Sequence, residues 1–167
     1  MLKKYTTKDF KQTQKLGEAL AKKILTLRQA QGKKTAVVLS LQGNLGGGKT
    51  TFLQGFAKGL GIKEKVLSPT FVILKKFRMP ALSGFKYFYH IDCYRIKNHK
   101  DITQLGFKEI ISNSENIIAV EWPEKIKKVL PKDSIVMKFK FIYPERSRRV
   151  AQNKREIAVN FENGLLK

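Results

Sequence analysis

The stretch that decides the fold is Gly43-Asn44-Leu45-Gly46-Gly47-Gly48-Lys49-Thr50, which matches the phosphate-binding pattern G-x-x-x-x-G-K-[ST]. It follows the apolar run Ala36-Val37-Val38-Leu39-Ser40-Leu41 and leads into a helical pattern. In such a loop the backbone N–H groups point inward around phosphates, the lysine reaches the β- and γ-phosphate oxygens, and the threonine hydroxyl ligates Mg²⁺. A chance glycine-rich turn is a poor explanation when a strand precedes it and a helix follows. The sequence therefore predicts a nucleotide-binding loop.

The length and composition predict one globular domain covering residues 1–167, with one core. No apolar run reaches the roughly 20 residues that a membrane helix needs, and no apolar stretch follows the basic N-terminus as in a secretory signal. Cys93 is the only cysteine, so no disulfide forms within the chain. Together these absences predict a cytoplasmic location.

The chain carries 34 Lys and Arg against 13 Asp and Glu, a formal net charge of +21. One interpretation is a surface that meets RNA or acidic proteins, because cationic side chains release counterions when they neutralise phosphates. The other is a solvated lysine-rich surface, since the charge is spread along the chain and no aromatic-interleaved RNA-binding motif is present. Composition does not choose between them.

Hydrophobic periodicity predicts an α/β order. Apolar spacings of three, four and seven residues predict a helix over 8–27, a buried strand over 35–42, and a second helix from Thr50 to Leu60. Aromatic and β-branched residues then predict two strands, 70–77 and 85–91, joined as a hairpin by the loop 79–84.

The second half of the chain continues the pattern. It predicts one or two short helices over 101–111 broken at Gly106, a buried strand 117–121, a short helix 123–130, and late strands 134–143 and 156–161. The basic segment 144–155 is predicted to be an exposed loop. The fold class is therefore a single-domain P-loop NTPase-like α/β sandwich, with a central mixed β-sheet flanked by helices and ligand at the carboxyl ends of the strands.

A phosphate loop needs further groups to hold Mg²⁺, position water and sense the γ-phosphate, and Ser68-Pro69-Thr70-Phe71 is one candidate segment. A threonine hydroxyl at the start of a strand can reach Mg²⁺ or the γ-phosphate as a switch element. The alternative, which the residues alone favour, is an ordinary turn in which Pro69 fixes the backbone.

A second candidate is His90-Ile91-Asp92-Cys93-Tyr94-Arg95 at the end of an aromatic strand. Strand alternation places His90, Asp92 and Tyr94 on one face. Asp92 is suited to binding Mg²⁺ through water or to orienting an attacking water. A structural aspartate that pairs with Arg95 or caps a loop is an equally good interpretation, and His90 is interpreted as a packed structural histidine.

The third candidate is Val120-Glu121-Trp122-Pro123, which places a carboxylate at the end of an apolar strand. The second acidic motif of phosphate-loop NTPases stands at such a position, so Glu121 is the best candidate for binding Mg²⁺ or orienting water. Trp122 is suited to stacking on a base or a partner, although a lone tryptophan beside proline more often fills a core.

These four motifs, in this order, resemble the TsaE (formerly YjeE) family, and the resemblance runs from Thr13 to about Ile142. The family is the small bacterial ATPase of tRNA N6-threonylcarbamoyladenosine biosynthesis. The resemblance implies an ATPase, weak alone, that binds the TsaB–TsaD complex and resets it by hydrolysing ATP. It meets tRNA only through that complex.

The resemblance also assigns residues. It implies contacts with ATP from the loop and its neighbours, Mg²⁺ held by Thr50 and Glu121, and hydrolysis that needs Asp92. Lys49 stabilises the phosphates, and Thr70 falls on the switch segment. The full set of nucleotide contacts is Leu45, Gly46, Gly47, Gly48, Lys49, Thr50, Thr51, Thr70 and Trp122, with Phe10 and Arg155 as weaker candidates.

The sequence departs from the family pattern at Asn44, Gly47 and Cys93. None of these changes removes a ligand, because the two loop positions act through backbone N–H groups and Cys93 replaces one buried apolar residue by another. The basic stretch Arg146-Ser147-Arg148-Arg149 is longer than the family's usual connection and has no assigned chemistry.

Two other functions stay open at the level of sequence. One is a small-molecule kinase, for which the arginine-rich segment would serve as a lid. The other is a basic RNA-binding module with a vestigial nucleotide site, motivated by the net charge alone. The residues do not decide between ATP and GTP, do not divide the roles of Asp92 and Glu121, and do not give the oligomeric state.

Overall fold

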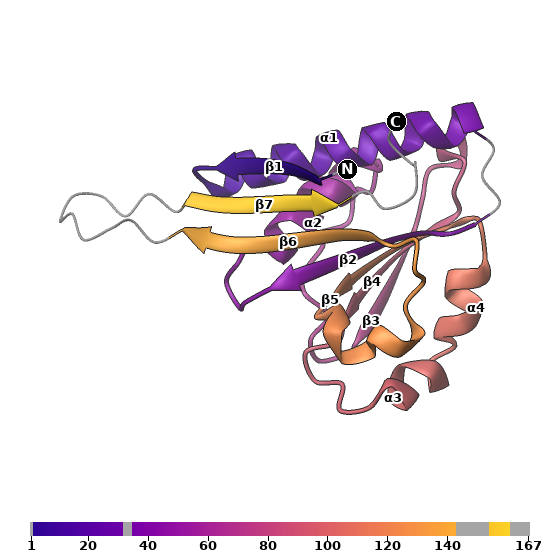
Figure 1. The fold of residues 1–167 in the computed structure, drawn as a ribbon. Coiled ribbons are helices and arrows are strands. Elements are labelled where there is room, and N and C mark those ends of the chain that lie inside the picture. The colour runs from indigo at the N-terminus through magenta and orange to yellow at the C-terminus, as the bar shows by residue number, and fades with distance from the viewer. Residues whose placement is uncertain (1, 32–34, 143–153, 161–167) are drawn as a thin grey trace.

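A computed structural model describes residues 2–31, 35–142 and 154–160. Seven strands form one mixed sheet in the order β1-β7-β6-β2-β5-β4-β3 (Figure 1). The strands are β1 (Leu2–Thr7), β2 (Val37–Gly43), β3 (Leu74–Arg78), β4 (Tyr87–Asp92), β5 (Asn116–Glu121), β6 (Ile135–Ile142) and β7 (Lys154–Asn160). Strands β6, β2, β5 and β4 run parallel, and the remaining neighbours pair antiparallel. The predicted mixed α/β sheet is confirmed.

Helices cover both faces of the sheet, as Figure 1 shows. The long helix α1 (Phe10–Gln31) and α2 (Lys49–Gly59) lie on one face, and α3 (His99–Gln104) and α4 (Phe107–Ser112) lie on the other with the 3₁₀ segment η2 (Pro123–Val129). A shorter 3₁₀ segment, η1 (Ala81–Ser83), lies between β3 and β4. Two separate apolar clusters result, one on each face. Central strands buried on both sides explain the continuous apolar runs in the sequence.

Close packing of α1 on α2 fixes the helix that carries the phosphate loop. A Cβ atom added at Gly55 would lie 1.9 Å from the carbonyl oxygen of Gln14, and one added at Gly17 would lie 2.2 Å from that of Phe52. Only glycine allows this approach, since real Cβ atoms do not come so near to backbone oxygen. Helix α1 therefore holds α2, and with it Lys49, in a fixed position against the sheet.

Most predicted elements are confirmed, including the β3–β4 hairpin and the two short helices separated by Gly106. The strand predicted over 70–77 is wrong in its first part: residues 70–73 form a turn and β3 begins at Leu74. The helix predicted over 123–130 is 3₁₀ over Pro123–Val129. Strand β1 was not predicted, because its lysines disfavour a strand unless β7 supplies a pairing edge.

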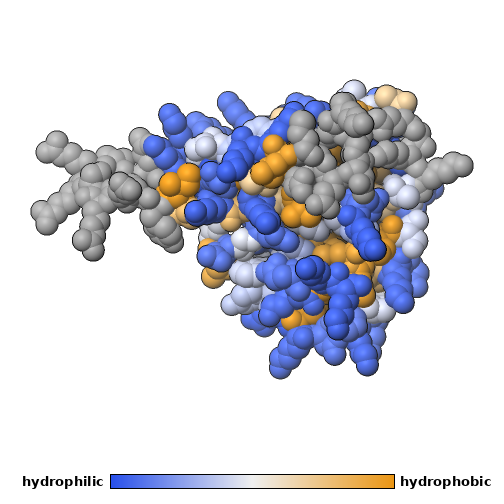
Figure 2. Space-filling model, viewed as in Figure 1, coloured by the Kyte–Doolittle hydropathy of each residue, from blue (hydrophilic) through white to orange (hydrophobic). Residues whose placement is uncertain are grey.

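The basic segment 144–155 was predicted as a loop, and residues 144–153 lie outside the described part of the chain. Lys154 and Arg155 belong instead to β7, because their backbones pair with β6 and Arg155 also pairs with Thr7 of β1. Hydrophilic side chains are spread over the face shown in Figure 2 rather than gathered at one point, in line with the spread of lysines along the chain. No helix of the described residues is long and apolar enough to cross a membrane.

Candidate nucleotide site

The phosphate loop joins the carboxyl end of β2 to the first residue of α2. Gly48 adopts φ +96°, which glycine tolerates without strain. Lys49 is buried, and its ammonium donates to the carbonyl oxygens of Gly43 at 2.7 Å and of Asn44 at 3.0 Å. The loop thus binds its own lysine through two carbonyls, and the amide of Gly47 donates to the carbonyl oxygen of Asn44 at 3.1 Å.

The surroundings of Lys49 pull its pKa in opposite directions. Burial lowers the pKa from its usual value, while the carboxylates Glu121 and Asp92 act to raise it. The ammonium also lies 4.3 Å from the centre of the Trp122 ring, a cation–π contact. The buried ammonium attracts anionic oxygens such as those of phosphate, whereas the two carboxylates beside it favour a cation.

Strands β4 and β5 bring the two candidate carboxylates side by side. Asp92 and Glu121 are paired residues at the carboxyl ends of these parallel strands, next to β2. The amide of Cys93 donates to the carbonyl oxygen of Glu121 at 3.0 Å and extends the contact by one residue. Because the parallel strands β2, β5 and β4 have their carboxyl ends on the same side of the sheet, the loop and both carboxylates lie together there, as the sequence predicted.

Glu121 is buried and has two side-chain partners on one oxygen. The hydroxyl of Thr50 donates to Oε1 at 2.9 Å, and Nε2 of His90 lies 2.9 Å from the same atom. His90 is completely buried. The sequence analysis assigned His90 only a packing role, whereas its ring also contacts the carboxylate that bonds to the first turn of α2. Strand alternation places His90 on the same face as Asp92, but it does not identify the partner on β5.

Asp92 is buried and contacts the segment 68–70 instead. Its Oδ2 accepts from the hydroxyl of Ser68 at 2.5 Å and of Thr70 at 2.7 Å, and its Oδ1 accepts from the amide of Tyr94 at 2.9 Å. The alternative pairing of Asp92 with Arg95 does not occur, since the Arg95 guanidinium lies over the ring of Phe71 at 4.3 Å. Asp92 does cap the loop after β4, through its bond to the Tyr94 amide. Thr70 therefore reaches the site, although from a turn rather than from a strand.

Strained backbone flanks both carboxylates. Ile73 and Trp122 are the non-glycine residues with positive φ in the described part of the chain, at +65° and +58°. The carbonyl of Ile73 accepts from the amide of Asp92 at 2.8 Å, and Trp122 directly follows Glu121. A β-branched residue in this region is a genuine outlier, and such strain concentrates at functional sites.

One cavity of about 300 Å³ collects these groups. Its lining comprises the loop and the segments after β4 and β5: Leu45, Gly46, Gly47, Gly48, Lys49, Thr50, Thr51, Ser68, Thr70, Asp92, Tyr94, Glu121 and Trp122. The rings of Tyr94 and Trp122 lie 5.2 Å apart and form one wall. Ser68 and Tyr94 were not among the predicted contacts.

The two weaker candidates lie outside this lining. Phe10 is 55% exposed at the start of α1. Arg155 lies against the loop, because a Cβ atom added at Gly48 would fall 2.8 Å from its Cδ. Arg155 therefore contacts the loop from β7, whereas Phe10 contributes nothing to the cavity.

The residues present suit a hard divalent cation. Thr50, Glu121 and Asp92 offer hydroxyl and carboxylate oxygens, the ligand type that Mg²⁺ prefers. The described residues contain no group of three or more His, Cys, Asp or Glu side chains placed to hold a metal by themselves. A cation here would take its remaining ligands from phosphate and water, which is how Mg²⁺ is bound in phosphate-transfer sites.

The family model for "Threonylcarbamoyl adenosine biosynthesis protein TsaE" matches residues 7–151, which contain every one of these groups except Arg155. The chain belongs to the TsaE family. Its role is therefore in the biosynthesis of threonylcarbamoyladenosine in tRNA, and family membership implies a nucleotide-binding protein.

Individual relatives agree with the family model. The chain is 40% identical over 102 residues to the TsaE of Bacillus subtilis, covering 61% of this chain and 60% of that protein. It is 34% identical over 137 residues to the TsaE of Rickettsia prowazekii, covering 81% and 85%. The alignment with the Bacillus protein thus spans less than two thirds of that relative's length.

A solved structure shares the fold over nearly the whole TsaE domain. The crystal structure of Bacillus subtilis YdiB superposes with a TM-score of 0.65 and 31% identity, covering 98% of this chain and 88% of that one. The mixed seven-stranded sheet with helices on both faces is therefore the architecture of this family member as well as of YdiB.

Proposed function

We propose that the chain is a Mg²⁺-dependent ATPase that binds the TsaB–TsaD complex and resets it by hydrolysing ATP. One observation carries the proposal: the phosphate loop, the Thr50–Glu121 pair and Asp92 with its two hydroxyl partners line one cavity. Phosphoryl transfer to water needs a phosphate cradle, a cation site and a group that orients water. These three are adjacent here.

The contacts suggest how the two carboxylates divide the work. Glu121 is bound to Thr50, the loop hydroxyl that ligates the cation in phosphate loops, so Glu121 and Thr50 would hold Mg²⁺. When bound, Mg²⁺ neutralises charge on the β- and γ-phosphates. Asp92 lies beside Glu121 but bonds to Thr70 instead of Thr50, and from there it would accept a hydrogen bond from the attacking water.

Lys49 would exchange its present partners for phosphate oxygens. In this structure its ammonium donates to the carbonyl oxygens of Gly43 and Asn44. Charge-assisted hydrogen bonds to phosphate oxygens would replace these two bonds. Positioning and charge neutralisation then supply most of the rate acceleration, since phosphoryl transfer needs little covalent help from the protein.

Exposed apolar side chains form a rim around the cavity, and they support an activity that depends on a partner. Leu45, Leu67, Phe71 and Val72 are each more than half exposed, and Leu45 lines the cavity while the other three adjoin Ser68 and Thr70. Large apolar side chains gathered around a functional opening mark interaction surfaces. A partner that covers this rim would exclude water and fix the segment 68–73, and the isolated protein would then be only weakly active.

Steady-state ATP hydrolysis tests the proposal, measured with and without purified TsaB–TsaD and tRNA. The proposal predicts partner-stimulated turnover that falls at least about a hundredfold in Lys49→Ala, because a preorganised cationic donor is lost. Lys58→Ala is the matched control, since Lys58 is an exposed lysine on the same helix paired with Glu18. Hydrolysis strictly dependent on an added metabolite would instead indicate a kinase, and tight RNA binding without nucleotide affinity would indicate a vestigial site.

A further inference from the structure

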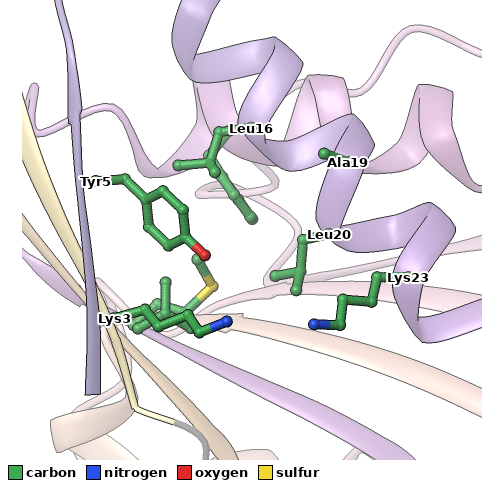
Figure 3. A pocket seen from close by; sticks show the side chains of 9 residues that line it. Lys3, Tyr5, Leu16, Ala19, Leu20 and Lys23 are labelled. Carbon is green, nitrogen blue, oxygen red and sulfur yellow. The ribbon is translucent and has the colours of Figure 1, made fainter. Parts of the chain in front are cut away.

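A second cavity, of about 140 Å³, lies under α1 at the β1 edge of the sheet (Figure 3). It shares no lining residue with the nucleotide cavity. Its apolar wall is made by Leu16 and Leu20 of α1, Phe52 of α2, Met137 of β6 and Val159 of β7. An enclosed apolar cavity of about this size, near 150 Å³, holds a molecule as large as benzene.

The opening of this cavity is cationic. Lys3 of β1 and Lys23 of α1 line it, and Figure 3 shows their ammonium groups extending toward each other across the opening. The hydroxyl of Tyr5 points to the same side. Among the described lining residues there is no Asp or Glu, and the nearest acidic residue of α1, Glu18, already pairs with Lys22 and Lys58.

This combination selects one class of ligand. Two like charges that face each other repel, and an anion placed between them removes the repulsion and gains two charge-assisted hydrogen bonds. An apolar wall beside that anion site favours a ligand with a hydrocarbon body about the size of a benzene ring. A carboxylate suits the opening, because each of its two oxygens can accept from one ammonium.

We propose that the cavity binds a small aromatic or branched aliphatic monocarboxylate, with its ring or chain against Leu20 and Phe52 and its carboxylate between Lys3 and Lys23. The site is separate from the ATPase proposal, since it uses none of the residues assigned to nucleotide. A ligand here would contact α2 one residue beyond the threonines Thr50 and Thr51 of the phosphate loop.

Titration of the ¹⁵N-labelled full-length protein with benzoate, followed by amide chemical shifts, tests the proposal. We expect saturable shifts in β1 and in residues 16–23, and an affinity for uncharged benzamide lower by at least about tenfold, which corresponds to about 1.4 kcal/mol. The variant Lys3→Met/Lys23→Met should lose that preference. Lys4→Met/Lys15→Met is the control, because it removes the same charge from the same two elements outside the cavity.

A second variant distinguishes loss of binding from loss of folding. Ala19 is an exposed residue that lines the cavity, so Ala19→Phe should block benzoate while leaving the thermal midpoint near that of the wild type. The proposal is overturned if the shifts are absent or confined to the phosphate loop, if benzamide binds as well as benzoate, or if Ala19→Phe still binds. None of these outcomes depends on ATP hydrolysis.

Discussion

The two walls of the nucleotide cavity are built differently. One wall, formed by Lys49 and Glu121 with His90 bonded behind Glu121, is buried and hydrogen-bonded to the loop backbone and to the first turn of α2. The other wall, formed by the segment 68–73 with Asp92, is exposed over Phe71 and Val72 and contains the strained Ile73. Under the proposed function, the groups that would bind phosphate and Mg²⁺ are already held in place, while the segment that would help to position water stays open to a partner.

Conservative changes of the two carboxylates, one on each wall, should have the largest effect on turnover. Glu121→Gln and Asp92→Asn keep side-chain size and remove the charge, and each should lower partner-stimulated turnover by at least about a hundredfold. Circular dichroism and thermal unfolding check that both variants fold. Near-normal turnover in both would remove these residues from the mechanism.

Removal of the exposed ring at position 71 should affect only the partner-facing wall. Because the Phe71 side chain is 82% exposed and does not line the cavity, Phe71→Ser should leave unstimulated hydrolysis within about twofold and reduce stimulation by TsaB–TsaD about tenfold. Leu105→Ser is the control, since Leu105 is an exposed apolar residue between α3 and α4. Equal loss of stimulation in both variants would argue against a specific apolar contact.

Changes at His90 should affect the buried wall by a smaller amount. His90→Gln retains a donor for Glu121, whereas His90→Phe leaves the buried carboxylate without it, and the Mg²⁺ concentration needed for half-maximal turnover should rise about threefold to tenfold in the phenylalanine variant alone. The glutamine variant separates positioning from packing. If both variants raise the requirement equally, the ring itself rather than its hydrogen bond is what matters.

Several features of the site follow from local sequence, and others depend on contacts between distant residues. The loop, the buried strands and both carboxylates were predicted, because glycine spacing and apolar runs are local signals. The hydrogen bond from His90 to Glu121 joins two strands, and the position of Arg155 depends on pairing with β1 and β6. No local pattern carries that information.

The turn at 70–73 is a segment whose local sequence predicts the wrong structure. Its aromatic and β-branched residues favour a strand, yet the amides of Val72 and Ile73 both bond to the carbonyl of Pro69, and the hydroxyl of Thr70 bonds to Asp92. Tertiary hydrogen bonds to β4 thus override a local β preference. Such overrides are expected where a site stores strain.

The smallest expected effect concerns Cys93, which is buried just beyond Asp92. Burial, chiefly, raises the pKa of its thiol to about 12. An unfolded thiol ionises near pH 8.5, so above that pH the unfolded state releases a proton that the folded state keeps, and stability falls as pH rises. Cys93→Ala should therefore lose about 2 kcal/mol less free energy of unfolding than the wild type between pH 7 and pH 10.

Urea unfolding at the two pH values measures this difference. Lysine and tyrosine titration is common to both proteins and cancels in the comparison. An identical loss of stability in the two proteins would show that the thiol is not protected by the fold at this strand end.

The division between the two walls is tested most directly by one titration. Trp122 is the only tryptophan and lies beside Lys49, so its fluorescence reports nucleotide binding as Mg²⁺ is added at a fixed ATP concentration without partners. We predict that Glu121→Gln raises the Mg²⁺ midpoint at least about tenfold and that Asp92→Asn leaves it within about twofold. Equal shifts in the two variants, or a larger shift in Asp92→Asn, would contradict the assignment of Mg²⁺ to the buried wall.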